Sequence, residues 1–512
     1  MFRFTTEVEI RRVIKSLSTK KAAGYDEIPA QFIKKIGMKL TKPICQLFNQ
    51  CIRENTFPDK MKMANITPLF KKKDKLNKDN YRSVNLLPIL SKIFEKLLYN
   101  QMFEYMERLF HKYLSGFRKG HSCQDILIRM IEDWRESIDQ GLIVGVIAID
   151  LSKAFDCMPH GLLLAKLSAY GFDFNACQLI KSYLMKRKQR VKIGETFSAW
   201  VNNIKGVPQG SILGPLLFNI FVNDFLHYEF QSKIYNYADD NTLCCTDVNI
   251  DNLKDKLQAD CLNAMQWFTK NSMKANASKF QVMFLCKNID LNNNVIKVND
   301  TNIEASNSIN ILGIELDKDL KFQLQIDNIC CQTGKQINAL KRIRHYLDKK
   351  SRIIIYNSYI NSNFSYCAAV WMFTNKCNRE KLERTNKRAL RFVTGKTHLS
   401  YEQMTDNLKQ LNIYRKCVKV TAVLMYKIKN GLAPTYLSEL FTPQESNYDM
   451  RDSNKFALPK YNTVKFGRNS FRYYGAKLWN QIPVNIKNSS SPNSFKSAVN
   501  KWLLTCNEIV IT

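Results

Sequence analysis

Two short runs rich in β-branched residues in the middle of the chain end in aspartates. Residues 142–149 (LIVGVIAI) precede Asp150, as expected of a buried strand. A second pair of runs, within residues 233–245, flanks Asp239 and Asp240, which form the only Asp-Asp dipeptide of the sequence. This pattern predicts a hairpin with its turn at the acids. Two adjacent like charges between apolar strands are costly unless a cation neutralises them.

Three aspartates on strand ends suit a pair of divalent ions. Nucleotidyl transfer to a 3′-hydroxyl develops charge that two metal ions roughly 3.5 to 4 Å apart can stabilise. Mg²⁺ prefers hard oxygen ligands and commonly takes one or two carboxylates. We therefore predict that Asp150, Asp239 and Asp240 converge and bind two Mg²⁺ ions, with Mn²⁺ as an alternative. Acids at strand ends are also ordinary turn formers, and for Asp150 taken alone that role is the commoner one.

The chain is strongly basic, with 77 Lys and Arg against 45 Asp and Glu and a net charge of +32. Such a balance predicts a polyanionic partner, either nucleic acid or an anionic membrane surface. The least polar runs, residues 142–149 and 212–222, are much shorter than the ~20 residues that a membrane span needs. The N-terminus lacks the apolar stretch of a signal peptide. We therefore expect no membrane partner and an intracellular location, in the nucleus or the cytoplasm, with the 15 cysteines as reduced core thiols.

The spacing of apolar residues divides the chain into four regions: a helical extension over residues 1–60, a mixed region over 61–320, a helical region over 321–395, and a last region, 396–512, of unknown role. In the third region one helical stripe at 100° per residue is cationic and comprises Lys381, Arg384, Arg388 and Arg391. Gly395 is expected to cap that helix. A stripe of this kind is as often merely solvated as bound to nucleic acid.

Several motifs resemble those of non-LTR retrotransposon reverse transcriptases, in particular the jockey-like and CR1-like elements. Residues 148–156 (AIDLSKAFD) resemble their first carboxylate motif, and residues 237–240 (YADD) resemble the second. Between them, residues 206–215 (GVPQGSILGP) resemble the motif that positions the template and the nucleotide. The resemblance implies an α+β right-hand polymerase, with fingers and an antiparallel palm sheet in residues 61–320 and a thumb in 321–395, followed by a mainly helical C-terminal region.

The same resemblance implies an RNA-directed DNA polymerase that uses a template RNA, a DNA primer and deoxynucleoside triphosphates. It makes Asp150, Asp239 and Asp240 catalytic metal ligands and brings Lys279 to the leaving pyrophosphate. It assigns contacts with the incoming nucleotide to five residues: Arg82, Lys71, Phe155, Gln209 and Gly210. The template would contact Arg118, and the duplex would lie on the cationic stripe.

Simple physical chemistry supports several of these roles. The guanidinium of Arg82 can bind phosphate through two hydrogen bonds, and the ring of Phe155 would collide with a 2′-hydroxyl. Gly210 lets the backbone approach the nascent base pair, while the Gln209 amide can form hydrogen bonds there. Arg82, Lys71 and Lys279 could equally be ordinary surface cations, and Phe155 could be an ordinary core residue.

The sequence departs from the pattern of this family at several points, and other classes of protein stay open. Tyr237 stands where these elements more often have Phe, and Ser83 stands where they usually have Pro. An endonuclease segment normally precedes this region, so the chain by itself is not expected to nick DNA. A silent remnant that binds nucleic acid would keep the basic surface and lose the acids. A two-metal nuclease would not need Gln209 and Gly210, and an RNA-copying RNA polymerase would not place Phe155 under the sugar.

Overall fold

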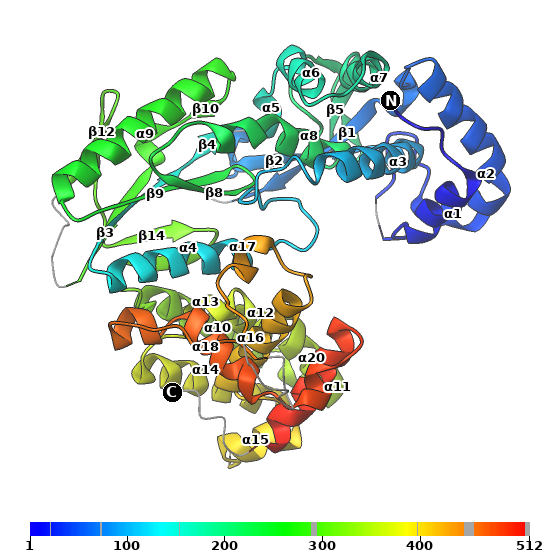
Figure 1. The fold of residues 1–512 in the computed structure, drawn as a ribbon. Coiled ribbons are helices and arrows are strands. Elements are labelled where there is room, and N and C mark those ends of the chain that lie inside the picture. Colours follow the sequence, from blue (N-terminus) through cyan, green and yellow to red (C-terminus); the bar gives the residue numbers. More distant parts are fainter. Residues whose placement is uncertain are drawn as a thin grey trace. The chain divides into compact units, whose positions relative to one another are not determined.

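The computed structural model describes residues 1–20, 22–71, 74–152, 154–287, 294–396, 398–444 and 455–506 (Figure 1). The chain folds into two compact units, and each unit combines segments that are distant in the sequence. The first unit contains residues 1–117, 151–229 and 263–276, and the second contains residues 118–150, 230–262 and 277–512.

The first unit combines helices with a small mixed sheet. Its helices are α1 (Glu7–Ser16), α2 (Ala30–Arg53), α3 (Ile89–Met106), α5 (Ala154–Cys157), α6 (His160–Ala169), α7 (Phe174–Leu184) and α8 (Leu213–Val222), with 3-10 turns at Asp59–Met61, Lys78–Asn80 and Asn223–His227. The sheet contains β1 (Met63–Phe70), β2 (Tyr81–Leu86), β5 (Arg187–Ile193), β6 (Thr196–Phe197) and β7 (Val201–Asn203). Strand β1 is antiparallel to β2 and parallel to β5. A separate short pair joins β4 (Leu151–Ser152) to β10 (Lys274–Ala275).

The helical start of the chain confirms the prediction for this region. Helix α1 begins with a capping box in which the Thr6 hydroxyl accepts the N–H of Glu9 and the Glu9 carboxylate accepts the N–H of Thr6. A guanidinium nitrogen of Arg3 lies 2.6 Å from a carboxylate oxygen of Glu9. This hydrogen bond lowers the pKa of Glu9 to about 2. Helix α6 begins directly after Pro159, and Leu163 and Leu167 are buried on its core face.

The second unit is built on a four-stranded antiparallel sheet in the order β11-β3-β9-β8, which comprises β11 (Gln281–Leu285), β3 (Ile143–Ile149), β9 (Asp240–Asp247) and β8 (Lys233–Tyr237). Helix α4 (Cys123–Asp139) packs against β3 and β8 (Figure 1). Helix α9 (Ile250–Lys270) approaches the central strand β3 so closely that a Cβ on Gly145 would lie 2.3 Å from a Leu257 methyl carbon. The strand and the hairpin predicted around the aspartates are both present.

Two small hairpins and a run of helices complete this unit. The hairpins pair β12 (Val295–Val298) with β13 (Thr301–Glu304) and β14 (Ser308–Ile311) with β15 (Ile314–Asp317). The helices are α10 (Gln323–Lys341), α11 (Lys349–Ile355), α12 (Asn361–Ser365), α13 (Ala368–Trp371), α14 (Lys376–Thr394), α15 (Tyr401–Asn407), α16 (Ile413–Lys429), α17 (Thr435–Ser438), α18 (Phe471–Gln481), α19 (Val484–Lys487) and α20 (Pro492–Thr505). A 3-10 turn lies at Arg344–Tyr346, and short π-helices lie at Tyr356–Ile360 and Val464–Arg468. The predicted helical character of this half is confirmed, and Gly395 caps α14 at φ 74°.

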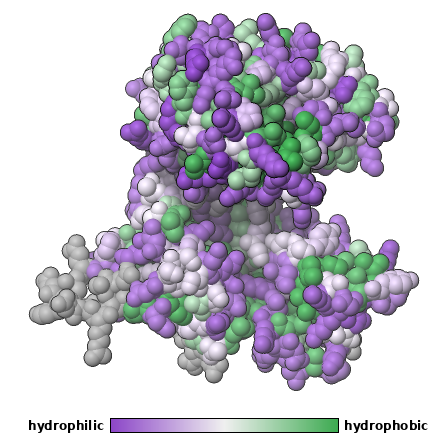
Figure 2. Space-filling view, turned by 90° about the vertical axis from the view of Figure 1, so that its right-hand side faces the viewer, coloured by the Kyte–Doolittle hydropathy of each residue, from purple (hydrophilic) through white to green (hydrophobic). Residues whose placement is uncertain are grey.

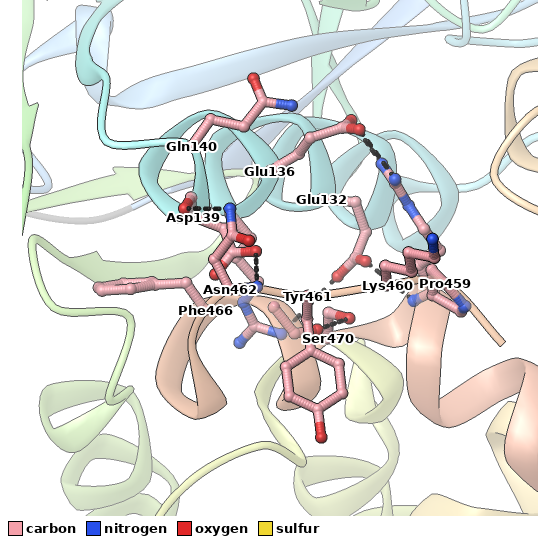
Figure 3. A pocket seen from close by; sticks show the side chains of 13 residues that line it. Glu132, Glu136, Asp139, Gln140, Pro459, Lys460, Tyr461, Asn462, Phe466 and Ser470 are labelled. Atoms are coloured by element: carbon pink, nitrogen blue, oxygen red, sulfur yellow. Dashed lines mark hydrogen bonds and ion pairs between the residues drawn. The ribbon is translucent and has the colours of Figure 1, made fainter.

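The C-terminal segment is attached to helix α4 by three acids on one face of that helix, Glu132, Glu136 and Asp139 (Figure 3). The carboxylate of Glu132 accepts the N–H groups of Phe471 and Arg472 at 2.8 and 2.9 Å, at the start of α18. Asp139 accepts the N–H groups of Asn462 and Thr463. The Arg472 guanidinium binds Glu136 through two hydrogen bonds. These contacts surround a cavity of about 250 Å³.

The surface and the thiols complete the description. On the face shown in Figure 2, hydrophilic residues predominate and apolar side chains form small separate groups. Within the described residues, no helix combines the length and the apolar character that crossing a bilayer requires. All 15 cysteines are free thiols. Cys331 and Cys377 are exposed, so the prediction that the cysteines are core residues is wrong for these two, which lie on solvent-facing sides of α10 and α14.

Candidate active site

The three aspartates come to one end of the sheet in the second unit. Strand β3 pairs with β9 so that Ile149 lies opposite Asn241, and Asp150 follows β3 directly. Asp239 lies in the turn between β8 and β9, and Asp240 is the first residue of β9. All three line one open cavity of about 440 Å³. The convergence that the sequence pattern predicted is therefore present, and metal binding by these residues stays a prediction.

The turn that carries Asp239 is tight and left-handed. Tyr237 pairs with Asp240, which leaves two residues in the turn, and Ala238 adopts φ 58°. This conformation costs an L-residue about 1 to 2 kcal/mol. Buried asparagines on both sides stabilise it: Asn236 donates to the Ala238 carbonyl at 2.8 Å, and Asn241 donates to the Asp239 carbonyl at 3.3 Å. Sequence reasoning missed both asparagines, although their positions flanking the turn were a usable signal.

Like charges meet in this cavity. The side chain of Asp240 is accessible to solvent. Even so, the surrounding protein desolvates its carboxylate, and this desolvation raises the pKa of Asp240 to about 6, with a further contribution from the negative charges of Asp239 and Asp150. The only described cation beside the acids in this cavity is Lys279, whose Nζ lies 3.3 Å from a carboxylate oxygen of Asp150. The lysine expected near the leaving pyrophosphate is thus adjacent to the predicted metal ligands.

The donor set fits Mg²⁺ in kind, because three hard carboxylate oxygens converge and their mutual repulsion favours a bound cation. The arrangement is not yet a coordination shell. Among the described residues, no group of three or more Asp, Glu, His or Cys side chains stands close enough to hold a metal ion.

The same cavity is lined by residues that sequence reasoning did not propose. Tyr366 donates a hydrogen bond of 2.6 Å to the carbonyl of Leu312 in the turn between β14 and β15. Asn310 and Cys123 also line the cavity. The Tyr366 contact joins the helical part of the unit to a hairpin beside the acids, and no local pattern in the sequence indicates such a distant pairing.

The predicted nucleotide contacts lie in the first unit. Phe155 stacks on Phe218 with 4.5 Å between ring centroids and meets Phe117 edge to face at 5.6 Å. The Gln209 amide donates to the carboxylate of Asp156 at 3.1 Å. Gly210 follows at φ 112°. The hydrogen bond of Gln209 joins the loop before α8, which carries Gln209 and Gly210, to α5, which carries Phe155.

Arg82 and Lys71, the two cations predicted to contact the nucleotide, lie on and beside the sheet of the first unit. Arg82 is exposed on β2, opposite Leu69 of β1. Lys71 is exposed just beyond β1, and its N–H donates to the carbonyl of Asn80 at 2.8 Å. Lys72 and Lys73, the rest of the predicted basic patch, lie outside the described residues.

The cationic stripe of α14 is only partly available. Arg384, Arg388 and Arg391 are exposed, whereas Lys381 forms an ion pair with Asp327 of α10. Because the Asp327 carboxylate balances its charge, Lys381 offers less net positive charge to a ligand than the three arginines do. Beside the stripe lies an open groove of about 700 Å³, and it is lined by Lys376, Arg379, Glu380, Glu383, Arg384, Lys387, Tyr401 and Tyr414.

Arg118, the predicted template contact, is half-buried in the second unit. Its positive charge adds to the burial of His121, and together they lower the pKa of that imidazole to about 4. His121 is therefore neutral at physiological pH, and the positive charge of this loop comes from Arg118 and Lys119.

Comparison with known proteins places these features in a class. Residues 70–316 match the family described as "Reverse transcriptase (RNA-dependent DNA polymerase)". The probable RNA-directed DNA polymerase from transposon BS of Drosophila melanogaster is 26% identical over 420 residues, which cover 79% of this chain and 46% of the relative. The RNA-directed DNA polymerase from mobile element jockey of Drosophila funebris is 28% identical over 406 residues, which cover 76% and 43%.

Among solved structures, telomerase from Candida albicans in complex with a fragment of telomeric RNA is 12% identical, with a TM-score of 0.39 over 72% of this chain and 70% of that chain. The chain spans less than half the length of the transposon relatives.

The chain carries a reverse transcriptase domain. More narrowly, the chain is similar to the LINE-type reverse transcriptases of non-LTR retrotransposons. The predicted resemblance to this family and the α+β right-hand polymerase fold are therefore confirmed. Reverse transcriptases generally use divalent metal ions, whereas the roles of individual residues and the borders of fingers, palm and thumb stay predictions.

Proposed function

We propose that this chain is an active RNA-directed DNA polymerase that extends a DNA 3′-hydroxyl along a template RNA. One observation carries the proposal: Asp150, Asp239 and Asp240 line a single cavity together with Lys279. Carboxylates on strand ends and a tight turn are held by a rigid support, which suits a reaction that depends on positioning. Deoxynucleoside triphosphates are the substrates, and the site of action is intracellular, in the nucleus or the cytoplasm.

The residues divide the work as follows. Asp150, Asp239 and Asp240 hold two Mg²⁺ ions, or Mn²⁺ in their place. When bound, the ions stabilise the charge on the transferring phosphoryl group. Lys279 stays beside Asp150 and can supply a proton or a positive charge to the departing pyrophosphate.

The first unit binds the nucleotide. Arg82 and Lys71 contact the triphosphate, and Phe155 excludes a 2′-hydroxyl. Gln209 and Gly210 shape the surface under the nascent base pair. The contact of Phe155 with Phe218 supports this role, because a steric filter works only if the ring cannot move aside.

The nucleic acid binds along the exposed cations. Arg118 contacts the template, and Arg384, Arg388 and Arg391 contact duplex phosphates, with a smaller share for Lys381. The adjacent groove adds Arg379 and Lys387, next to the rings of Tyr401 and Tyr414. Cations beside aromatic rings favour nucleic acid, since phosphates pair with the former and bases stack on the latter.

Asp239→Asn tests the proposal. We expect DNA synthesis on poly-rA with a DNA primer and dTTP to fall by roughly 10²-fold or more, because a charge that stabilises the transition state is lost. Binding of an RNA–DNA duplex, followed by fluorescence anisotropy, should stay nearly unchanged.

Asp247→Asn is the matched control, because Asp247 lies at the far end of β9, the strand that begins directly after Asp239, and is paired with Lys256 at 2.6 Å. We expect this variant to keep wild-type synthesis. An Asp239→Asn variant with wild-type turnover would refute the metal assignment.

A second candidate is a silent remnant that binds nucleic acid without copying it. The basic surface of this chain would serve such a remnant equally well, because Arg384, Arg388 and Arg391 are exposed on α14. The same assay separates the two: a wild-type chain that binds duplex normally but makes no DNA with either Mg²⁺ or Mn²⁺ is the remnant.

A further inference from the structure

A buried carboxylate holds the loop that contains Gln209 and Gly210. Glu95 lies in the middle of α3 and is 0% exposed. One of its oxygens accepts the N–H of Ile212 at 2.7 Å and the N–H of Leu213 at 3.2 Å. The other accepts the hydroxyl of Ser91 at 3.0 Å. These two backbone N–H groups lie two and three residues after Gly210 in the chain.

The carboxylate replaces a cap that α8 lacks. The first N–H groups of a helix have no partner within the helix, and they attract negative charge. The residue before α8 is Ile212, whose side chain cannot accept a hydrogen bond, and the Ser211 hydroxyl accepts the N–H of Gly214 but not those of Ile212 and Leu213. Glu95 supplies the missing acceptor from a different helix, and so connects the start of α8 to α3.

The opposite side of the loop is fixed by strand β2. The N–H of Asn85 donates to the carbonyl of Gln209 at 2.7 Å. A Cβ on Gly210 would lie 2.8 Å from the carbonyl oxygen of Asn85, so the loop backbone is pressed against the strand. Between these anchors, the Ser211 hydroxyl donates to the Pro208 carbonyl and accepts the N–H of Gly214, both at 2.9 Å.

Stability alone explains Glu95 poorly. Its neighbours on α3, Phe94 and Leu98, are 0% exposed and apolar. A charge buried among such residues carries a desolvation penalty that often equals or exceeds what its partners return. Burial raises the pKa of Glu95, and the nearby Arg187 guanidinium opposes that rise. A carboxylate kept here at such a penalty suggests a role in holding geometry.

We propose that Glu95 is a positioning residue for the polymerase reaction: through the N–H groups of Ile212 and Leu213 it sets the backbone of Gln209 and Gly210 under the incoming nucleotide. The inference rests on the proposed function. Glu95 itself touches no substrate, so its loss should affect the binding of the nucleotide more than that of the primer and template.

Three variants test this role. Glu95→Ala removes both acceptors, and Glu95→Gln keeps one amide oxygen for the two N–H groups. Met102→Ala is the control, because Met102 is 1% exposed on the same helix and no hydrogen bond links it to the loop. Each variant is assayed for KM for dTTP and for kcat on primed poly-rA, and its Tm is measured in parallel.

Glu95→Ala should raise KM for dTTP about tenfold or more, since two buried donors lose their acceptor, with KM for primer and template unchanged. Glu95→Gln should lie between Glu95→Ala and wild type. Met102→Ala should lower Tm and leave KM for dTTP at the wild-type value. The proposal is overturned if Glu95→Ala keeps the wild-type KM, or if Met102→Ala raises KM equally. If Glu95→Ala does not fold, Glu95→Asp takes its place, because the shorter acid keeps the charge and loses the reach.

Amide hydrogen exchange separates this proposal from the proposed function. A peptide covering residues 207–216 should exchange faster in Glu95→Ala than in wild type, whether or not the protein makes DNA. If the wild-type chain makes no DNA but this difference is seen, the polymerase assignment fails and the anchoring of the loop by Glu95 stands. Equal exchange in both proteins would show that Glu95 does not hold the loop.

Discussion

Phe155 is held between two aromatic rings, one stacked and one edge to face. A ring fixed in this way can act as a steric filter, because moving it aside would break both contacts. The same contacts are those of a core residue, so packing alone does not distinguish the two roles. Only a measurement of which sugar is incorporated distinguishes the two roles.

We predict that Phe155→Val relaxes that choice. Removing the ring opens space for a 2′-hydroxyl, and incorporation of ribonucleotides relative to deoxynucleotides should rise by roughly tenfold or more. The measurement is the ratio of kcat/KM for dTTP and UTP on primed poly-rA. Phe218→Leu keeps the Phe155 ring but removes its stacking partner, so this variant should relax the choice of sugar to a smaller extent than Phe155→Val. Unchanged rejection of UTP in Phe155→Val would show that the ring is structural.

Single residues were predictable where a motif names them, and not where a distant contact gives them their role. Asp150, Asp239 and Asp240 stand out because acids interrupt apolar strands. Glu95 does not stand out, because one acid in an amphipathic helix is ordinary in a sequence. Only the approach of residue 212, more than a hundred positions later, gives it a function.

At the scale of elements, the turn between β8 and β9 is the part that places two of the acids. Ala238 occupies a left-handed conformation, and this state persists because Asn236 and Asn241 bind the carbonyls of the turn. The amide of Asn236 also donates to the side-chain oxygen of Asn241 at 2.9 Å. The two asparagines therefore act as one support.

We predict that Asn241→Ala lowers both stability and turnover. Loss of this side chain removes its hydrogen bonds with the buried Asn236 amide and with the Asp239 carbonyl, at about 1 to 3 kcal/mol, and lets Asp239 move. Thermal unfolding and kcat on primed poly-rA provide the measurements. Ala238→Gly should keep kcat, since glycine adopts positive φ without penalty. An Asn241→Ala variant with wild-type kcat would contradict the role of the support.

Elements were predictable from local patterns, and their partners were less so. The β-branched run of β3, the helical period of α3 and the glycine at the end of α14 each express a local preference. The position of β11 beside β3 depends on residues far apart in the chain, and no local preference encodes it. The acids of α4 look like a solvated helix face, although Glu132 is 3% exposed beneath the C-terminal segment.

At the scale of the whole molecule, the net charge of +32 is the property that affects every encounter with nucleic acid. Cations that are already paired with carboxylates contribute little, because their charge is balanced before the ligand arrives. On α14 this separates Lys381, which is paired with Asp327, from Arg388, which is exposed. The distinction can be measured, since contact with each phosphate releases counterions.

We predict a steep decrease of affinity for an RNA–DNA duplex with salt, and a smaller slope in the double variant Arg384→Ala and Arg388→Ala. The slope of log Kd against log salt concentration should fall by about 1 to 2, because each phosphate contact contributes roughly 0.9 for duplex DNA and about 0.7 for a single strand. Fluorescence anisotropy between about 50 and 200 mM salt gives the slope. Over this range, a protein that binds many phosphates loses roughly 10³-fold or more of its affinity. Lys381→Ala is the matched control and should change it less. If the double variant keeps the wild-type slope, the stripe on α14 is only solvated, and the duplex must be held by other cations.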